Sequence, residues 1–282
     1  MKKILLPTDF SANAYNAITY AVNFFKDETC TFYLLNTFTP ILYDTEYILY
    51  STTQPGLEEI YRENSEKGLQ RILRRLNHKY KNPKHSFEPI SAFNLLIEEM
   101  KDQVKSKNID LVVMGTQGAT GAQEILMGTN TVNAIKKLKC PILAIPSEYV
   151  FEKPEYILFP TDYELDYSTK QMKILKEIIS LHKSKLNILH IATKELSPAQ
   201  EQAKHSLADQ LENKAHQFYS LEKKNITQAI YDFQNEHPTD MLVMINNKHS
   251  FFENLLFRPV VNKIGFHIKV PFLVIPSGKY SS

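Results

Sequence analysis

Residues 110–131 read DLVVMGTQGATGAQEILMGTNT, an unbroken apolar run followed by a segment rich in glycine. The apolar run is typical of a strand that is buried on both faces, as in a parallel sheet. Four of the chain's eight glycines lie between Gly115 and Gly128. Because glycine permits backbone conformations and close approaches that a Cβ would prevent, we expect a loop of unusual geometry directly after this strand.

The chain repeats this strand and its surroundings. Three motifs recur in the same order: KKILLPTD at 2–9 as EYILFPTD at 155–162, DLVVMG at 110–115 as DMLVMI at 240–245, and CPILAIP at 140–146 as VPFLVIP at 270–276. Ordered recurrence of this kind indicates two copies of one domain. The 282 residues suffice for two ordinary domains, which we place at 1–147 and 154–278.

Strand and helix patterns alternate within the first copy. Strands are expected at KILLPT, CTFYLLNTF, SFEPIS, DLVVMG and PILAIP, and helices after Ser11 and at 57–80, 94–106 and 129–138. The second copy follows the same order, with HQFYSLE as its expected third strand. This alternation predicts an α/β fold in which each copy is a parallel sheet with helices on both faces.

Composition and charge narrow the class of protein. The 33 basic and 31 acidic side chains give a net charge of +2, which offers no electrostatic case for nucleic acid or an anionic membrane as a partner. Two cysteines cannot form a disulfide framework, and no apolar run has the length of a signal peptide core or a membrane span. We therefore expect a soluble, cytoplasmic protein.

The spacing of reactive side chains excludes several kinds of chemistry. The nine histidines and two cysteines show no metal-ligand spacing, so no metal held by protein side chains is expected. No nucleophile-elbow motif occurs, and no histidine adjoins either cysteine, so a covalent hydrolase is not expected. We predict no catalytic residues.

The glycine segment lies where a parallel sheet binds its ligands, at the carboxyl ends of the strands. Thr8, Asp9 and Thr37 are expected at the same edge. Gly128 and Thr129 directly precede a helix, whose first N–H groups are unpaired and attract anions. The pattern predicts phosphate binding, although neither a Walker loop nor a dinucleotide fingerprint is present. A glycine-rich turn without a ligand is the alternative.

The spacing Gly115-x2-Gly118-x9-Gly128-Thr129 resembles the ATP-binding pattern G-x2-G-x9-G-S/T of universal stress proteins. The opening ILLPTDFS and the closing CPILAIP are similar to that family in position and order. The resemblance covers nearly the whole chain, as two tandem domains. It implies flavodoxin-like domains, similar to the adenine nucleotide α-hydrolases, each with a five-stranded parallel sheet.

The resemblance also implies a ligand and a site. Asp9, with Pro7 and Thr8 beside it, would meet the ribose and adenine; Thr37 would line the adenine; Met114 lies at the strand end; and Gly115, Gly118, Gly128 and Thr129, with Asn130 and Thr131 next to them, would hold the phosphates. The ligand implied is ATP, with or without Mg²⁺, while ADP, AMP or another adenine compound stays open. The last strands of the two copies would pair with each other, and a homodimer of the tandem chain stays open.

The second copy departs from the pattern. Ile245, Lys248, Arg258 and Pro259 stand where the first copy has Gly115, Gly118, Gly128 and Thr129. We therefore expect no ATP there in the manner of the first copy, although Asp162 is retained, and we assign it local hydrogen bonding. Apolar residues between Phe251 and Phe257 either pack or meet a partner. The tyrosine-rich segment 39–56 either covers the nucleotide, contacts a subunit or simply packs.

Three functions fit these observations. The first is a nucleotide-binding protein that regulates or senses stress, in which bound ATP biases assembly or partner contacts. The second is a slow ATPase or autophosphorylating protein, but residues 115–131 include no lysine or arginine to neutralise phosphate charge, so at most weak hydrolysis is expected. The third is a scaffold that binds no nucleotide.

Overall fold

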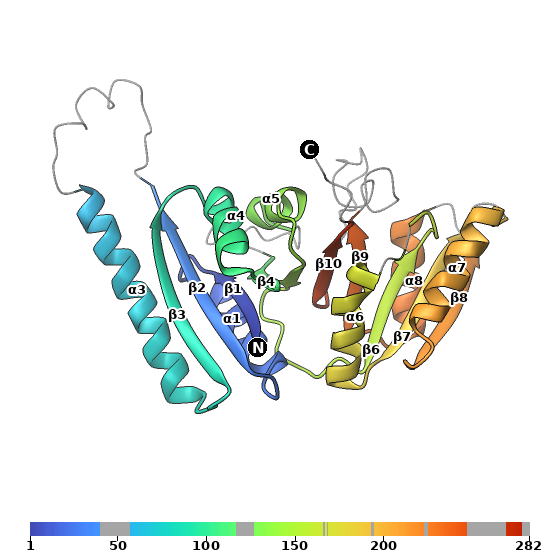
Figure 1. Cartoon of the computed structure of the whole chain (residues 1–282), viewed down its shortest axis with the longest axis horizontal. Coiled ribbons are helices and arrows are strands. Elements are labelled where there is room, and N and C mark those ends of the chain that lie inside the picture. The colour runs from blue at the N-terminus through green and yellow to red at the C-terminus, as the bar shows by residue number, and fades with distance from the viewer. Residues whose placement is uncertain are drawn as a thin grey trace, which may run out of the picture.

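The computed structural model describes residues 1–39, 57–116, 127–165, 167, 169–192, 195–222, 225–246 and 269–277 (Figure 1). Its strands form one ten-stranded sheet in the order β3-β2-β1-β4-β5-β10-β9-β6-β7-β8. The strands are β1 (Lys2–Pro7), β2 (Cys30–Phe38), β3 (His85–Phe93), β4 (Leu111–Gly115), β5 (Ile142–Ile145), β6 (Tyr156–Thr161), β7 (Lys185–Ala192), β8 (His216–Glu222), β9 (Met241–Asn246) and β10 (Phe272–Pro276). The order β3-β2-β1-β4-β5 recurs as β8-β7-β6-β9-β10, as the sequence repeat predicts.

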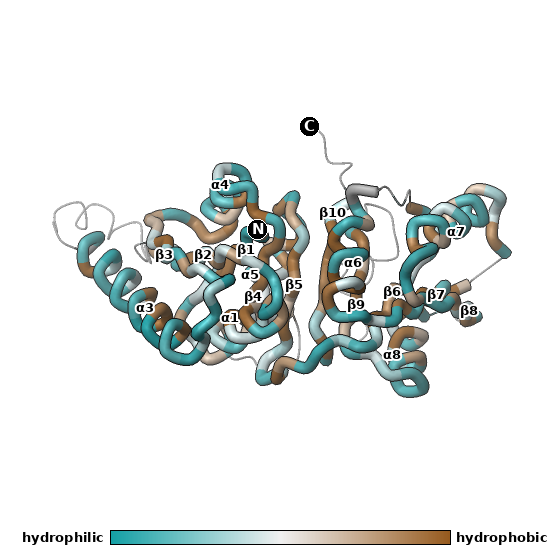
Figure 2. Tube along the Cα trace, turned by 60° about the horizontal axis from the view of Figure 1, so that its bottom comes forward, coloured by the Kyte–Doolittle hydropathy of each residue, from teal (hydrophilic) through white to brown (hydrophobic). Residues whose placement is uncertain are grey.

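Helices cover both faces of the sheet. They are α1 (Ala12–Phe24), α3 (Leu57–Lys79), α4 (Leu96–Lys107), α5 (Thr129–Lys137), α6 (Thr169–His182), α7 (Pro198–Gln210) and α8 (Ile226–Glu236). Helices α1, α3, α6 and α7 share one buried apolar cluster, and α4, α5 and α8 share a second cluster on the opposite face. The predicted α/β class is confirmed, and the two tandem five-stranded parallel halves join into one sheet. Figure 2 shows the hydrophobic segments gathered in the strands and hydrophilic ones along outer helices such as α3.

Local sequence accounts for several helix ends. The Ser11 hydroxyl accepts the Ala14 N–H and caps the start of α1, as the sequence predicts. Helix α7 begins with a capping box between Ser197 and Gln200. Helix α4 ends at Asn108, whose left-handed backbone conformation is one that asparagine adopts at helix ends.

The two halves of the sheet meet at β5 and β10, which pair antiparallel, whereas all other strand pairs are parallel. Leu143 lies opposite Leu273 at this joint, and both side chains are fully buried. The buried Asn246 amide donates to the Ile135 carbonyl at 3.1 Å, across the same boundary. The joint therefore combines main-chain pairing, apolar burial and a satisfied polar contact.

The connection between the halves packs against α1. The Tyr20 ring lies 6.1 Å from that of Tyr149 and 5.2 Å from that of Phe151. The Asn16 amide donates to the Tyr149 carbonyl at 3.2 Å. At the other end of α1, the Phe24 ring lies 4.2 Å from that of His182, the last residue of α6. Aromatic contacts thus join the first half to the second on this face.

The burial of His182 makes the stability of the chain depend on pH. Burial, assisted by the positive charge of Lys153, lowers the pKa of His182 to about 4 from its usual 6.5. The unfolded chain therefore binds this proton at higher pH than the folded chain does. We expect the contribution of neutral His182 to the unfolding free energy to be constant above pH 6.5. This contribution is lost as the pH falls from 6.5 towards 4.

The His182→Phe variant removes this titration and should show a flatter profile. Between pH 7 and pH 5, the wild type should lose about 1–2 kcal/mol more unfolding free energy than the variant, from the pKa difference discounted for partial solvation. Urea unfolding at a series of pH values measures the difference, because the two proteins differ only at residue 182. A His182→Gln variant checks that the effect comes from titration. Parallel pH profiles in all three proteins would contradict the prediction.

Candidate functional site

The carboxyl ends of β1, β2 and β4 carry the predicted site residues. Pro7 is the buried last residue of β1, and the adjoining Thr8 is also buried. The Thr8 hydroxyl accepts the Phe10 N–H at 3.0 Å, and its carbonyl accepts the Asn36 amide at 2.7 Å. Asp9 follows as an exposed side chain whose Oδ1 accepts the Ser11 N–H at 3.0 Å. Thr8 therefore supports the turn, and Asp9 presents its carboxylate at the edge.

Two other predicted site residues, Thr37 and Met114, differ in how far their side chains are exposed at the sheet edge. Thr37, in β2, is half-buried and pairs with Ala92 of β3. The Met114 side chain is 5% exposed and belongs to the apolar cluster under α4 and α5. At the carboxyl edge of the sheet, therefore, only the main chain of Met114 can contact a ligand.

Two hydrogen bonds hold the ends of the glycine segment together. The Gly128 N–H donates to the Thr116 carbonyl at 2.5 Å, and the Thr131 hydroxyl donates to the Gly115 carbonyl at 2.8 Å. The chain that leaves β4 therefore returns to the same place to begin α5. Gly118 lies between them, outside the described residues. Thr131 is buried, and its hydroxyl stabilises the loop ends.

The first turn of α5 has no cap from its own N-cap residue. That residue is Gly128, which has no side chain, and among the described residues no side chain accepts a hydrogen bond from the first N–H groups of the helix. Thr129 and Asn130, the first two residues of the helix, are exposed, and Lys136 and Lys137 lie in its last turn. A helix start beside the end of β4 offers main-chain donors and a partial positive charge to an anion.

Gly68, which sequence reasoning did not single out, supports the same edge. Phe10 has a left-handed backbone (φ 66°), and its 37%-exposed side chain lies against Gly68 of α3. A Cβ added at Gly68 would come within 2.4 Å of the Phe10 ring. A glycine inside a helix costs about 1 kcal/mol relative to alanine, so its isolated position in a helical pattern was the available signal.

The corresponding edge of the second half keeps the same hydrogen-bond frame. The Thr161 hydroxyl accepts the Tyr163 N–H at 3.0 Å, as Thr8 does for Phe10. His190 takes the place of Asn36, and its Nδ1–H donates to the Thr161 carbonyl at 3.1 Å. The Gln200 amide donates to the Asp162 carbonyl at 2.9 Å. The two strand ends therefore share one turn design.

Aromatic side chains close the second edge. The Tyr163 side chain is only 2% exposed and stacks on His190, with ring centroids 4.8 Å apart. The Tyr167 hydroxyl contacts the Thr161 hydroxyl from the connection that precedes α6. Burial raises the pKa of Tyr163 well above its usual value. Ile245, which replaces Gly115, is buried within β9. The described residues do not include Lys248, Arg258, Pro259 or the apolar residues 251–257 of the second half. They do not include residues 40–56 of the first half either.

The sequence predictions also concern metal ligands, membrane-spanning helices and thiols, and the findings on these features hold for the part of the chain that the structure describes. Within it, no three or more His, Cys, Asp or Glu side chains gather in a way that could hold a metal ion. No helix within it has the length and apolar character needed to cross a membrane. Burial raises the pKa of both Cys30 and Cys140 to about 12, so both thiols are protonated at neutral pH and are poor nucleophiles.

These features define a tandem α/β protein in which the carboxyl ends of β1 and β4 and the start of α5 meet at one edge of the first half. The profile of the universal stress protein family matches residues 1–146. The chain belongs to the universal stress protein family.

Individual relatives agree with this assignment. Universal stress protein MJ0531 of Methanocaldococcus jannaschii is 27% identical over 149 residues, which are 51% of this chain and 81% of that protein. Universal stress protein MJ0577 of the same organism is 27% identical over 155 residues, 51% of this chain and 94% of the relative. The crystal structure of a universal stress protein from Archaeoglobus fulgidus covers 99% of this chain and 97% of its own, with a TM-score of 0.69 and 17% identity. This last similarity shows the fold over both halves.

Proposed function

We propose that the first half, residues 1–147, binds ATP at the carboxyl edge of its sheet and that the chain acts as a nucleotide-dependent regulator of the stress response. The observation that carries this proposal is the first turn of α5, which has no side-chain cap from Gly128, beside the joined ends of the glycine segment. The start of a helix directs main-chain N–H groups to phosphate oxygens, and the Thr129 side chain is exposed there. Each anion–helix contact contributes about 0.3–2 kcal/mol.

Asp9 supplies the second part of the site. Its carboxylate is exposed at the end of β1, which neighbours β4 in the sheet. A carboxylate accepts hydrogen bonds from ribose hydroxyls, so Asp9 would orient the sugar while the α5 start holds the phosphates. Mg²⁺ would be bound largely by the phosphates and water, since Mg²⁺ needs few protein ligands in nucleotide sites.

The second half, residues 154–278, has a structural role in this proposal. Its edge is occupied by the Tyr163–His190 stack, where the first half leaves Phe10 exposed. We propose that the β5–β10 joint holds the two domains together as the working unit, the pairing that the family resemblance assigns to last strands. A cytosolic location fits, because ATP and a reducing environment that keeps Cys30 and Cys140 as thiols occur together there.

Matched carboxylate variants test the nucleotide site. We expect Asp9→Ala to weaken ATP binding about tenfold, the loss of one or two hydrogen bonds to a charged group, whereas Asp162→Ala should change it less than about twofold. Isothermal titration calorimetry on the full chain with ATP, ADP and AMP measures the affinities and identifies the preferred ligand. Equal effects of the two substitutions, or no ATP binding by the wild type, would refute the assignment. Phosphate release under single-turnover conditions would show whether bound ATP is hydrolysed.

A further inference from the structure

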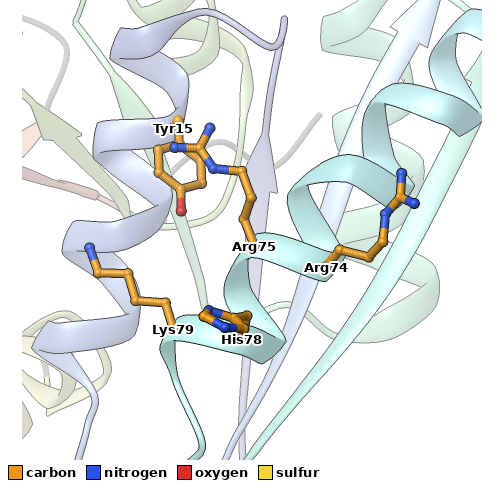
Figure 3. A pocket seen from close by; sticks show the side chains of 5 residues that line it. All are labelled: Tyr15, Arg74, Arg75, His78 and Lys79. Atoms are coloured by element: carbon orange, nitrogen blue, oxygen red, sulfur yellow. The ribbon is translucent and has the colours of Figure 1, made fainter.

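A basic hollow lies between α1 and the C-terminal part of α3 (Figure 3). It has a volume of about 660 Å³ and is lined by Tyr15, Arg74, Arg75, His78 and Lys79. Tyr15 comes from α1, and the four other residues come from α3. Cavities of about 300–1,000 Å³ are the size of small-molecule sites.

The positive charges of the hollow are not neutralised by the described part of the protein. Arg74, Arg75 and Lys79 form no ion pair with any described residue. The ion pairs within α3 lie in its first half, Glu58 with Arg62 and Glu63 with Lys67. Helix α1, the opposite wall, has the sequence ANAYNAITYAVNF and carries no charged side chain. An anion entering the hollow would therefore meet cations without displacing a carboxylate.

Tyr15 holds one of these cations in place. The guanidinium carbon of Arg75 lies 3.9 Å from the Tyr15 ring centroid, a cation–π contact that leaves the N–H edges of the guanidinium free. Figure 3 shows Arg75 extended across the Tyr15 ring and Lys79 reaching towards α1, while Arg74 points to the far side of α3. Arg75 and Lys79 are thus the two cations directed to the space between the helices. A guanidinium that is already positioned loses less conformational entropy when it binds a ligand.

The helix dipole does not explain the whole cluster. Basic residues favour the last turn of any helix, and His78 and Lys79 occupy that turn of α3. Arg75 lies a turn earlier and contacts α1 instead. Helix α7, the counterpart of α3 in the second half, has no basic residue in its last turn. The fold itself therefore does not require these charges.

We propose that this hollow binds a compact polyanion that carries several phosphate groups, at a site separate from that of the ATP phosphates. Phosphate oxygens match the bidentate geometry of Arg75 and the point charge of Lys79. Three of the five lining residues are Arg or Lys, and Arg75 covers one face of the Tyr15 ring, so the space favours an anionic ligand over an apolar one. Inorganic triphosphate represents this chemistry without a base or sugar.

Calorimetry with sodium tripolyphosphate at low ionic strength tests the proposal on the full chain. We expect the wild type to bind, and the double variant Arg75→Gln/Lys79→Gln to bind at least about tenfold more weakly because two charge-assisted contacts are lost. The matched control is Arg62→Gln/Lys67→Gln, which removes the same charge from the same helix outside the hollow. That control should change the affinity less than about twofold. Thermal unfolding checks that all proteins are folded.

A further variant separates this site from the nucleotide site. Gly118→Val, directed at the glycine segment, should retain tripolyphosphate binding even where it loses ATP binding. Loss of tripolyphosphate binding in Gly118→Val would place the anion at the glycine segment and overturn the proposal. Equal weakening by the two double variants would show a general charge effect and also overturn it, as would a wild type that does not bind tripolyphosphate at millimolar concentration. None of these results depends on whether ATP binds.

Discussion

The Gly118→Val variant is expected to bind ATP at least about a hundredfold more weakly than the wild type, a loss of about 2.7 kcal/mol. Gly118 follows two residues after Thr116, whose carbonyl accepts the Gly128 N–H, so it belongs to the segment that leaves β4 and returns to α5. The family resemblance assigns the glycines of this segment to the phosphates. A branched side chain there would occupy phosphate space and hinder main-chain donors.

The second copy provides the control for this experiment. Lys248 stands where the first copy has Gly118, and Lys248→Val should leave ATP affinity unchanged. Calorimetry gives the affinities, and thermal unfolding shows whether each variant keeps the wild-type stability. If a folded Gly118→Val protein bound ATP as tightly as the wild type, the phosphates would have to lie elsewhere.

A second large effect is expected at the joint between the halves. Leu273→Ala should lower the unfolding free energy by about 3–5 kcal/mol, because it opens a cavity in a fully buried position. Leu273 pairs with Leu143 of β5 and with Val243 of β9, so the cavity borders both halves. We therefore expect hydrogen exchange to become faster in β5 as well as in β9 and β10.

The matched control is Leu221→Ala in β8, the outermost strand of the second half. Leu221 is only half-buried, and its loss should cost about 1 kcal/mol. Urea unfolding measures both variants. A Leu273→Ala variant as stable as Leu221→Ala, or one with unchanged exchange in β5, would mean that the joint does not couple the two halves.

The strands were predicted correctly where their buried positions form an apolar run in the sequence. The strands β1, β4, β5 and β9 have nearly continuous buried runs, and apolar patterning located each of them. The third strand was expected at SFEPIS, but β3 extends over His85–Phe93. It lies at the sheet edge, where none of its residues is fully buried, so Ala92 and Phe93 at its far end lengthen the strand without forming part of a buried apolar run.

The arrangement of the candidate site residues could be predicted in part, while their role in binding stays a prediction. Repeats and glycine spacing indicated the edge that holds Asp9, Gly115 and Thr129, and the structure brings the described members together there. The contacts that support this edge were not predictable. Asn36 binds the Thr8 carbonyl and Gly68 accommodates Phe10, but each pair joins residues from different elements.

From its sequence alone, this chain could be assigned two copies of a parallel α/β domain and a glycine segment confined to the first copy. That information is local, since apolar runs and glycine spacing are visible within single segments. The packing of distant segments determined the rest: the Tyr163–His190 stack over the second edge, and the hollow in which Tyr15 holds Arg75. Such contacts depend on the distance and orientation of side chains that are far apart along the chain, and these exist only once the helices have packed on the sheet.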